Sequence, residues 1–242
     1  MHVKLALSTA GIRMQPLVTS VKENILLFYE EIEDDPYHRY RSWEHCYACF
    51  QRLQSSQSEE TIDVATLRLA FYLASWGMYR GSSQLLQKDY RIHTRIVLEL
   101  LETKYSQLWR LDFDSIADTA PEISLVIQLA KRLGRVYAEL GVSPTDTLVT
   151  KVLLGTFGCI PAYDTLFIRG VTHWNRALLA QCQPKFPARF GINSYRGLID
   201  FYREHKDEIK EAQTHISKYG IEYPVMKLAD MYFWNLGYQL GR

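Results

Sequence analysis

The chain has 242 residues, of which 47% are hydrophobic and 13% aromatic, so it can bury a sizeable core and does not have the composition of a disordered protein. Its 28 basic and 27 acidic residues leave a net charge of +1, which argues against a strongly basic nucleic-acid coat but allows one local basic face. No apolar run approaches the roughly 20 residues that span a bilayer, and residues 1–19 lack the apolar core of a secretory signal, so we expect a cytoplasmic protein.

Apolar residues at helical spacing recur along most of the chain, separated by Gly, Pro and polar clusters. In chain order they predict helices over residues 21–32, 43–53, 61–78, 85–101, 121–140, 143–156, 164–181, 194–219 and 225–240. Residues 3–7 or 11–14 are the candidates for a short strand. The predicted fold class is all-α, as a single domain over residues 1–242.

The two helices at 121–140 and 143–156 are expected to form a hairpin. Thr119 can cap the first helix, Pro121 sits in its first turn and Gly141 ends it. The second helix is expected to begin with Ser143 as its N-cap and Asp146 as the acid of a capping box. Such a tight turn presents backbone N–H groups at a helix start, which suits a phosphate.

The four cysteines do not predict a metal or redox site. Cys46 and Cys49 form a lone C-x-x-C, and Cys159 and Cys182 add no second pair with metal-like spacing. A structural zinc ion needs four ligands, and a redox C-x-x-C belongs near a βαβ pattern. We therefore expect no metal and no cofactor.

The segment from residue 151 to residue 169 is the most informative part of the chain. An apolar helix runs into a Gly/Pro turn that delivers Asp164 to the start of the next helix, with Thr165 next and Arg169 one turn later. A carboxylate at this place is either a helix cap or a catalytic group aimed into a cleft. The residues alone leave both interpretations open.

This order resembles the helix-hairpin-helix DNA glycosylase superfamily, of the 8-oxoguanine glycosylase and endonuclease III type. The likeness covers about residues 140–171, where Asp164, Thr165 and Arg169 match the family's Asp-Thr-x-x-x-Arg segment residue for residue. Ser143 stands where a second hairpin glycine is usual. The resemblance implies a two-lobed helical fold with a helix-hairpin-helix element. Its core lobe would cover about residues 110–182, and the remainder would come from residues 1–109 and 183–242.

The resemblance also implies a reaction, hydrolysis of the N-glycosidic bond of a damaged or modified base in double-stranded DNA. Asp164 would stabilise the positive charge that builds on the sugar as the base leaves. Some members add a lysine nucleophile, for which Lys151 is the candidate. Lys151 lies farther along its helix than the family's lysine, and it is the assignment that most needs a test. Repair, and defence against modified foreign DNA, are both compatible with this reaction.

A glycosylase must flip its base into a pocket with aromatic or apolar walls and a few polar groups. The candidates for that pocket are Trp76, Tyr79, Tyr163, Met226, Asp230 and Trp234. The candidates for phosphate contact are Gly141 and Ser143 in the hairpin turn, with Arg80, Lys88, Arg91 and Arg95 as a local basic surface. Without the resemblance, these aromatic residues would be read as core and these charges as a solvated face.

Two alternatives stay open. The same scaffold can serve as a non-catalytic module that binds nucleic acid or a protein partner, or the chain can be an unrelated helical interaction protein in which Asp164 is only a cap. The position of one residue pair discriminates between them. A common cleft for Asp164 and Lys151 with aromatic walls favours the enzyme, whereas an Asp164 buried in its cap with no cavity excludes it.

Overall fold

The computed structural model describes residues 20–54, 57–80, 83–179, 185–217 and 220–241. Within these ranges the regular structure is helical and no strand occurs, which confirms the all-α prediction. The candidate strands 3–7 and 11–14, and also Cys182, lie outside the described residues. None of the described helices has both the length and the apolar character needed to cross a membrane.

The helices are distributed along the whole described chain. The α-helices are α1 (Val21–Glu33), α2 (Arg41–Leu53), α3 (Glu59–Ser75), α4 (Thr94–Leu100), α5 (Pro121–Glu139), α6 (Asp146–Thr156), α7 (Thr165–Leu179), α8 (Ile192–Glu204), α9 (Lys206–Ser217) and α10 (Val225–Gln239). Short 3-10 helices are η1 (Gln84–Gln87), η2 (Tyr90–His93) and η3 (Thr103–Arg110).

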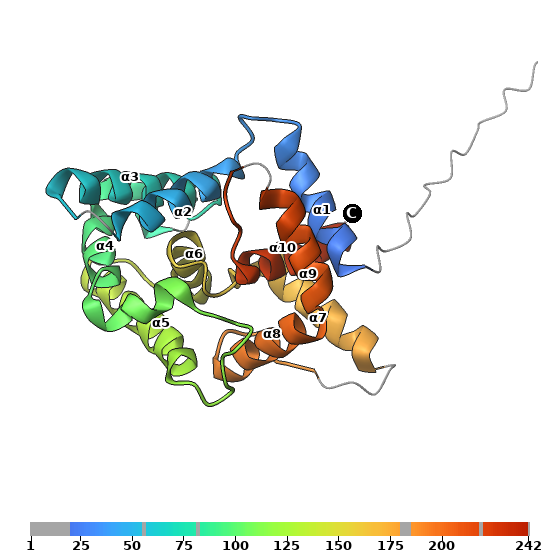
Figure 1. Cartoon of the computed structure of the whole chain (residues 1–242). Helices are drawn as coiled ribbons and strands as arrows, with labels where there is room; N and C mark the ends of the chain where they lie inside the picture. The colour runs from blue at the N-terminus through green and yellow to red at the C-terminus, as the bar shows by residue number, and fades with distance from the viewer. Residues whose placement is uncertain (1–19, 55–56, 81–82, 180–184, 218–219, 242) are drawn as a thin grey trace, which may run out of the picture.

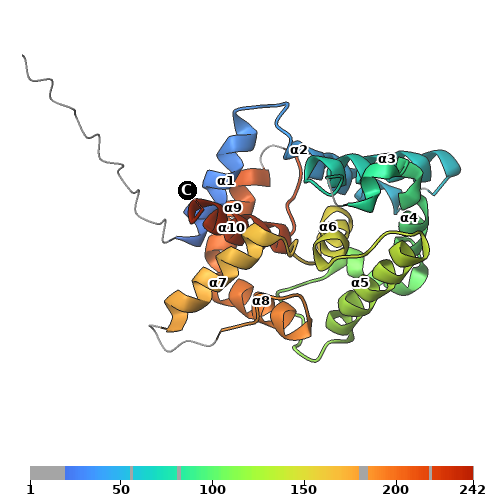
Figure 2. The ribbon, with the colours of Figure 1, turned by 180° about the vertical axis from the view of Figure 1, so that it is seen from behind.

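Helix α6 lies in the middle of the fold. Figures 1 and 2 show it between the α2–α3 pair on one side and α5 on the other, and it contacts all three. Every residue of α6 from Leu148 to Thr156 is buried, because the helix is apolar all round. A polar side chain placed on this helix is therefore carried into the interior.

The predicted helix over residues 85–101 is wrong in its first half. The structure has η1 and η2 there, and only α4 is a regular helix. Ser83 Oγ accepts the backbone N–H of Leu85, and Asp89 Oδ1 accepts that of Arg91. Short polar side chains that bond to the backbone two residues on compete with the helical ladder, and they break this segment twice.

Two further boundaries differ from the prediction. The segment 194–219 is not one helix, because it breaks at His205. Helix α8 packs on α5, and α9 packs on α1 and α10. Helix α6 begins two residues later than expected, because Thr145, not Ser143, is its N-cap and accepts the N–H of Leu148 through its hydroxyl. Likewise, Thr119 does not cap α5, whose N-cap Ala120 has no side-chain hydrogen bond.

Helices α7 and α10 make the closest helix pair in the fold. A β-carbon on Gly170 would lie 1.9 Å from the carbonyl oxygen of Phe233, and one on Gly237 would lie 1.9 Å from that of Leu166. Glycine at both positions lets the two backbones touch. This contact fixes the start of α7, which follows Asp164, against the C-terminal half of α10.

Candidate functional site

Lys151 is a lysine inside the apolar helix α6. Its side chain is only 5% exposed, and its ammonium donates to the carbonyl oxygen of Trp76 at 2.9 Å. The same nitrogen lies 3.4 Å from Asp164 Oδ2 and 5.5 Å from the centre of the Trp76 ring. Burial lowers the pKa of Lys151, while the charges of Asp164 and Asp230 act in the opposite direction.

Asp164 uses its two carboxylate oxygens for different purposes. Oδ1 accepts the backbone N–H groups of Leu166 and Phe167 at 3.0 and 3.1 Å and so caps α7. Oδ2 faces Lys151, and 16% of the side chain is exposed. The carboxylate is therefore a helix cap and also one wall of the space around the Lys151 amine.

Helix α6 holds the backbone in front of Asp164. The hydroxyl of Thr150 accepts the N–H of Tyr163 at 3.0 Å, and the hydroxyl of Thr147 donates to the carbonyl oxygen of Tyr163 at 2.8 Å. Both threonines lie on the helix that carries Lys151. The lysine and the aspartate are thus positioned by one rigid unit, although thirteen positions separate them in the sequence.

A small cavity lies between these side chains. It is lined by Tyr72, Trp76, Lys151, Leu154, Ala162, Asp164, Lys227, Asp230 and Trp234. Trp76 forms the aromatic wall and meets the Trp234 ring edge to face at 6.1 Å. The cavity offers about 10 Å³ to the centre of a water molecule, which is room for one water. A nucleobase would enter only after Trp76 or Trp234 moves.

The structure brings together five of the residues singled out from the sequence. Lys151, Asp164, Trp76, Asp230 and Trp234 come from four separate segments and line the same cavity. Lys151 was the poorest fit to the family's spacing, yet its amine lies beside Asp164.

Three candidates for the base pocket lie elsewhere. The buried Tyr163 turns away from the cavity and pairs its hydroxyl with Ser194 at 2.7 Å. Met226 is fully buried and is not among the residues that line the cavity. The hydroxyl of Tyr79 lies 2.7 Å from Nε2 of the buried His93, so Tyr79 links the turn after α3 to η2.

The predicted basic surface is partly neutralised. Arg91 lies 4.0 Å from Asp63, in the first turns of α3, and Arg95 pairs with Glu139 at 2.7 Å. Asp63 lies in the first turns of α3 and Trp76 directly follows its last residue, about 20 Å away along the helix axis, so Arg91 contacts the end of α3 opposite to the cavity wall. The exposed Arg80 follows the Trp76 turn directly and packs its guanidinium over Gly77.

The predicted hairpin turn, between α5 and α6, has open space at one residue and a satisfied backbone N–H at another. Gly141 has φ +74° and nothing within 4 Å of where a β-carbon would stand. The backbone N–H of Ser143 donates to the side-chain oxygen of Gln84, so it is already satisfied within the protein. Lys88, by contrast, is exposed and has no ion-pair partner within the described ranges.

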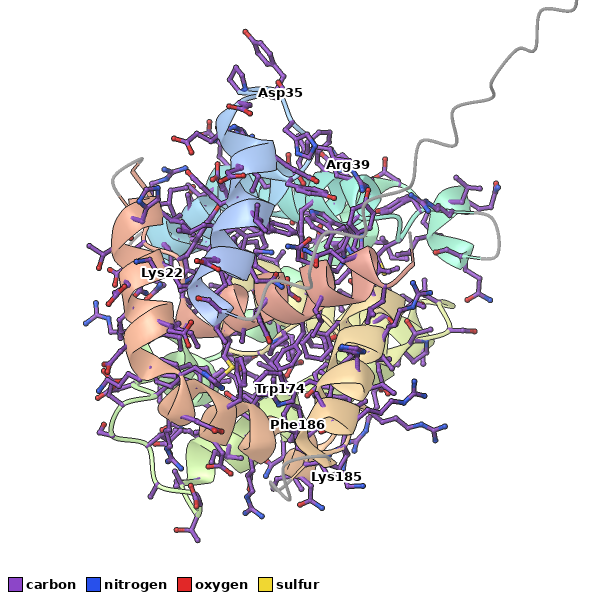
Figure 3. All side chains as sticks on the ribbon, turned by 90° about the vertical axis from the view of Figure 1, so that its right-hand side faces the viewer. Lys22, Asp35, Arg39, Trp174, Lys185 and Phe186 are labelled. Carbon is purple, nitrogen blue, oxygen red and sulfur yellow. The ribbon has the colours of Figure 1, made fainter. Side chains whose placement is uncertain are left out.

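Sequence analysis missed three residues of this region. Lys227 and Tyr72 line the cavity. Arg39, labelled in Figure 3, is exposed and places its guanidinium 4.9 Å from the Tyr40 ring and 5.8 Å from the Trp76 ring. The sequence signal for Lys227 was available, because it is a lysine three residues before Asp230 on an otherwise apolar helix.

The three cysteines that the structure describes do not line the cavity. Cys46, Cys49 and Cys159 are buried free thiols, and burial raises the pKa of each. The described residues contain no cluster of His, Cys, Asp and Glu side chains suited to a metal ion.

Comparison with known proteins adds nothing to this geometry. No family model, no curated protein and no solved structure matches the chain significantly. The function therefore has to be argued from the site's own residues.

Proposed function

We propose that the chain is a DNA N-glycosylase, a divergent relative of the helix-hairpin-helix glycosylases, that removes a damaged or modified base from double-stranded DNA. One observation carries the proposal. The Lys151 amine and the Asp164 carboxylate lie 3.4 Å apart in a nearly closed cavity with a tryptophan wall. Burial lowers the pKa of the Lys151 amine, and a buried amine with a lowered pKa beside a carboxylate in a cavity is typical of functional sites.

The two groups suit glycosidic chemistry. As the bond between sugar and base breaks, the bonding electron pair leaves with the base and positive charge develops on the sugar. The Asp164 carboxylate would stabilise that charge, because Oδ2 keeps a free side while Oδ1 is held by the α7 backbone. A low dielectric strengthens this interaction.

Lys151 would act as the nucleophile in its neutral form. Its amine would attack the sugar C1′ as the bond from C1′ to the base breaks and the base leaves with that electron pair. The nitrogen would then give up its two protons, one to the departed base and one to the ring oxygen O4′, and breaking of the C1′–O4′ bond would leave a Schiff base between Lys151 and the opened sugar. Burial lowers its pKa and so increases the neutral fraction that the attack needs. The Trp76 indole N–H is a further polar group for a ligand, because it is buried and has no acceptor in the described part of the chain.

DNA contact would come from the surface around Trp76. Arg39 and Arg80 are both exposed and lie on either side of the Trp76 turn, where their positive charge suits phosphate groups. The exposed Gly141, in the turn that follows α5, would add a backbone contact.

The test measures base release on duplex oligonucleotides that carry a panel of damaged and modified bases. We expect abasic sites with at least one base, and about 100-fold slower release in Asp164→Asn. Asp146→Asn is the matched control, since it is an exposed aspartate at the start of α6. Equal rates for wild type and Asp164→Asn would refute the role of Asp164.

A borohydride trapping assay tests the lysine separately. The wild type should form a covalent adduct with substrate DNA, and Lys151→Met should form none. Lys131→Met, which changes an exposed lysine of α5, should trap like the wild type.

The closed cavity favours a second candidate function, a non-catalytic module that binds nucleic acid through the same surface. With room for one water, the site is as compatible with a structural ion cluster as with a reaction. DNA binding that weakens with salt, without base release from any substrate, would establish this alternative.

A further inference from the structure

A second buried ion pair lies beside the first. On α10, Lys227 Nζ is 3.0 Å from Asp230 Oδ2, and the two side chains are only 3% and 4% exposed. The Lys227 ammonium also lies 5.3 Å from the ring centres of Phe28, Trp43 and Trp76. An ammonium enclosed by three aromatic rings is held in place by its charge as well as by packing.

Asp230 connects this pair to the backbone that carries Asp164. Its Oδ1 accepts the backbone N–H of Ala162 at 2.9 Å in the interior. Two residues later, the N–H of Asp164 donates to the carbonyl oxygen of Ala162 at 2.8 Å. The turn before Asp164 is therefore tied to α10 on one side and to α6 on the other.

The pair also faces the Lys151 amine across the cavity. Both Lys227 and Asp230 line that cavity with Lys151, Asp164 and the hydroxyl-bearing Tyr72 of α3. Two ammonium groups and two carboxylates thus line one small cavity. Burying such pairs costs several kcal/mol of desolvation per ion, and apolar replacements are often as stable. Stability alone is a poor reason for this arrangement.

We propose that Lys227 and Asp230 are positioning residues of the site: Asp230 anchors the backbone that carries Asp164, and the charges of the pair set the electrostatic field at the Lys151 amine. This inference rests on the proposed function, in which Lys151 and Asp164 are the reacting groups. It assigns no contact with substrate to either residue.

The charges of the pair act on Lys151 in opposite directions. Burial lowers the pKa of Lys151 most, the carboxylates of Asp164 and Asp230 raise it, and the Lys227 ammonium lowers it. Loss of the Lys227 charge leaves Asp230 unopposed, so the Lys151 pKa should rise. Loss of the Asp230 charge leaves Lys227 unopposed, so the Lys151 pKa should fall.

NMR titration of the full chain labelled with ¹³C,¹⁵N-lysine measures this directly, with the Lys151 signal assigned by its loss in Lys151→Arg. We expect Lys227→Met to raise the Lys151 pKa by about one pH unit and Asp230→Asn to lower it by about one pH unit. In the double variant Lys227→Met/Asp230→Asn the value should return to within about half a unit of wild type. This double variant leaves no unpaired charge and serves if a single variant fails to fold.

Hydrogen exchange tests the anchor. Asp230→Asn keeps an acceptor for the Ala162 N–H and should preserve its slow exchange, whereas Asp230→Ala should speed that exchange at least tenfold. Shifts of the Lys151 pKa in the same direction in both single variants, a double variant far from the wild-type value, or equal Ala162 protection in Asp230→Asn and Asp230→Ala, would overturn the proposal. None of these readouts needs a substrate, so their outcomes do not depend on whether the protein has glycosylase activity.

Discussion

His93 allows a direct test of how burial changes the protonation of a side chain in the interior. Its ring is fully buried between two tyrosine hydroxyls, with Nε2 2.7 Å from Tyr79 Oη and Nδ1 2.8 Å from Tyr137 Oη. Burial lowers the pKa of His93 from 6.5 to about 4. The folded protein therefore keeps this ring neutral at pH values where the unfolded chain protonates it.

The size of the effect follows from the two pKa values. Between pH 6.5 and pH 4 the unfolded state binds a proton at His93 that the folded state does not, so acid favours unfolding. Stability should thus rise with pH through this window. When the pH falls from 7 to 5, His93 should lower the free energy of unfolding by about 2 kcal/mol.

Urea unfolding at pH 7, 6 and 5 isolates this contribution when wild type is compared with His93→Gln. Glutamine keeps a donor and an acceptor for the two tyrosines but cannot take a proton. Between pH 7 and pH 5, the free energy of unfolding should fall by about 2 kcal/mol less in the variant than in the wild type, whatever the variant's stability at pH 7. Parallel curves for the two proteins would refute the reasoning, because all other titrating groups are shared.

Two further predictions test packing and capping. Gly170→Ala should destabilise the fold by about 3 kcal/mol, because its β-carbon would collide with the Phe233 carbonyl. Gly134→Ala, in α5 with its nearest neighbour at 3.6 Å, should be neutral or stabilising by up to about 1 kcal/mol. Thermal melts compare the pair, and equal losses would contradict the close α7–α10 crossing. Thr145→Ala should cost about 1 kcal/mol while Ser143→Ala costs almost nothing, as measured by urea unfolding. The reverse order would restore Ser143 as the N-cap.

Local sequence patterns predicted the helices but not their interruptions. Apolar periodicity located α1, α5 and α10 within two residues at each end. It failed at residues 85–101 and at His205, where the hydrophobic pattern continues through a break. Side chain to backbone hydrogen bonds of Ser83 and Asp89 accompany the first break. At the second break, α8 and α9 share contacts with α10, but α8 also packs on α5 and α9 on α1. Neither feature leaves a mark in the periodicity.

The site was predictable in part because its central residue has a local signature. Asp164 follows a Pro turn and starts a helix, a place typical of either a cap or a catalytic carboxylate, and the family resemblance made it the catalytic candidate. The aromatic candidates differ in the direction of their side chains. Trp76 lines the cavity, whereas Tyr163, next to Asp164 in sequence, points to Ser194. Sequence adjacency does not fix the direction of a side chain in a turn, which depends on the bonds that α6 makes to the Tyr163 backbone.

Asp164 can serve both as a helix cap and as a reacting carboxylate, because its two oxygens have different partners. Oδ1 of Asp164 is fully engaged by two backbone N–H groups of α7, so the carboxylate cannot rotate without uncapping the helix. That constraint leaves Oδ2 pointing in one direction, toward the Lys151 amine. In the proposed reaction, capping would hold the carboxylate in the fixed orientation that electrostatic stabilisation of a transition state requires. Asp164→Asn can retain the cap through its amide oxygen while it removes the charge, so a loss of activity without a loss of stability would separate the two roles in one variant.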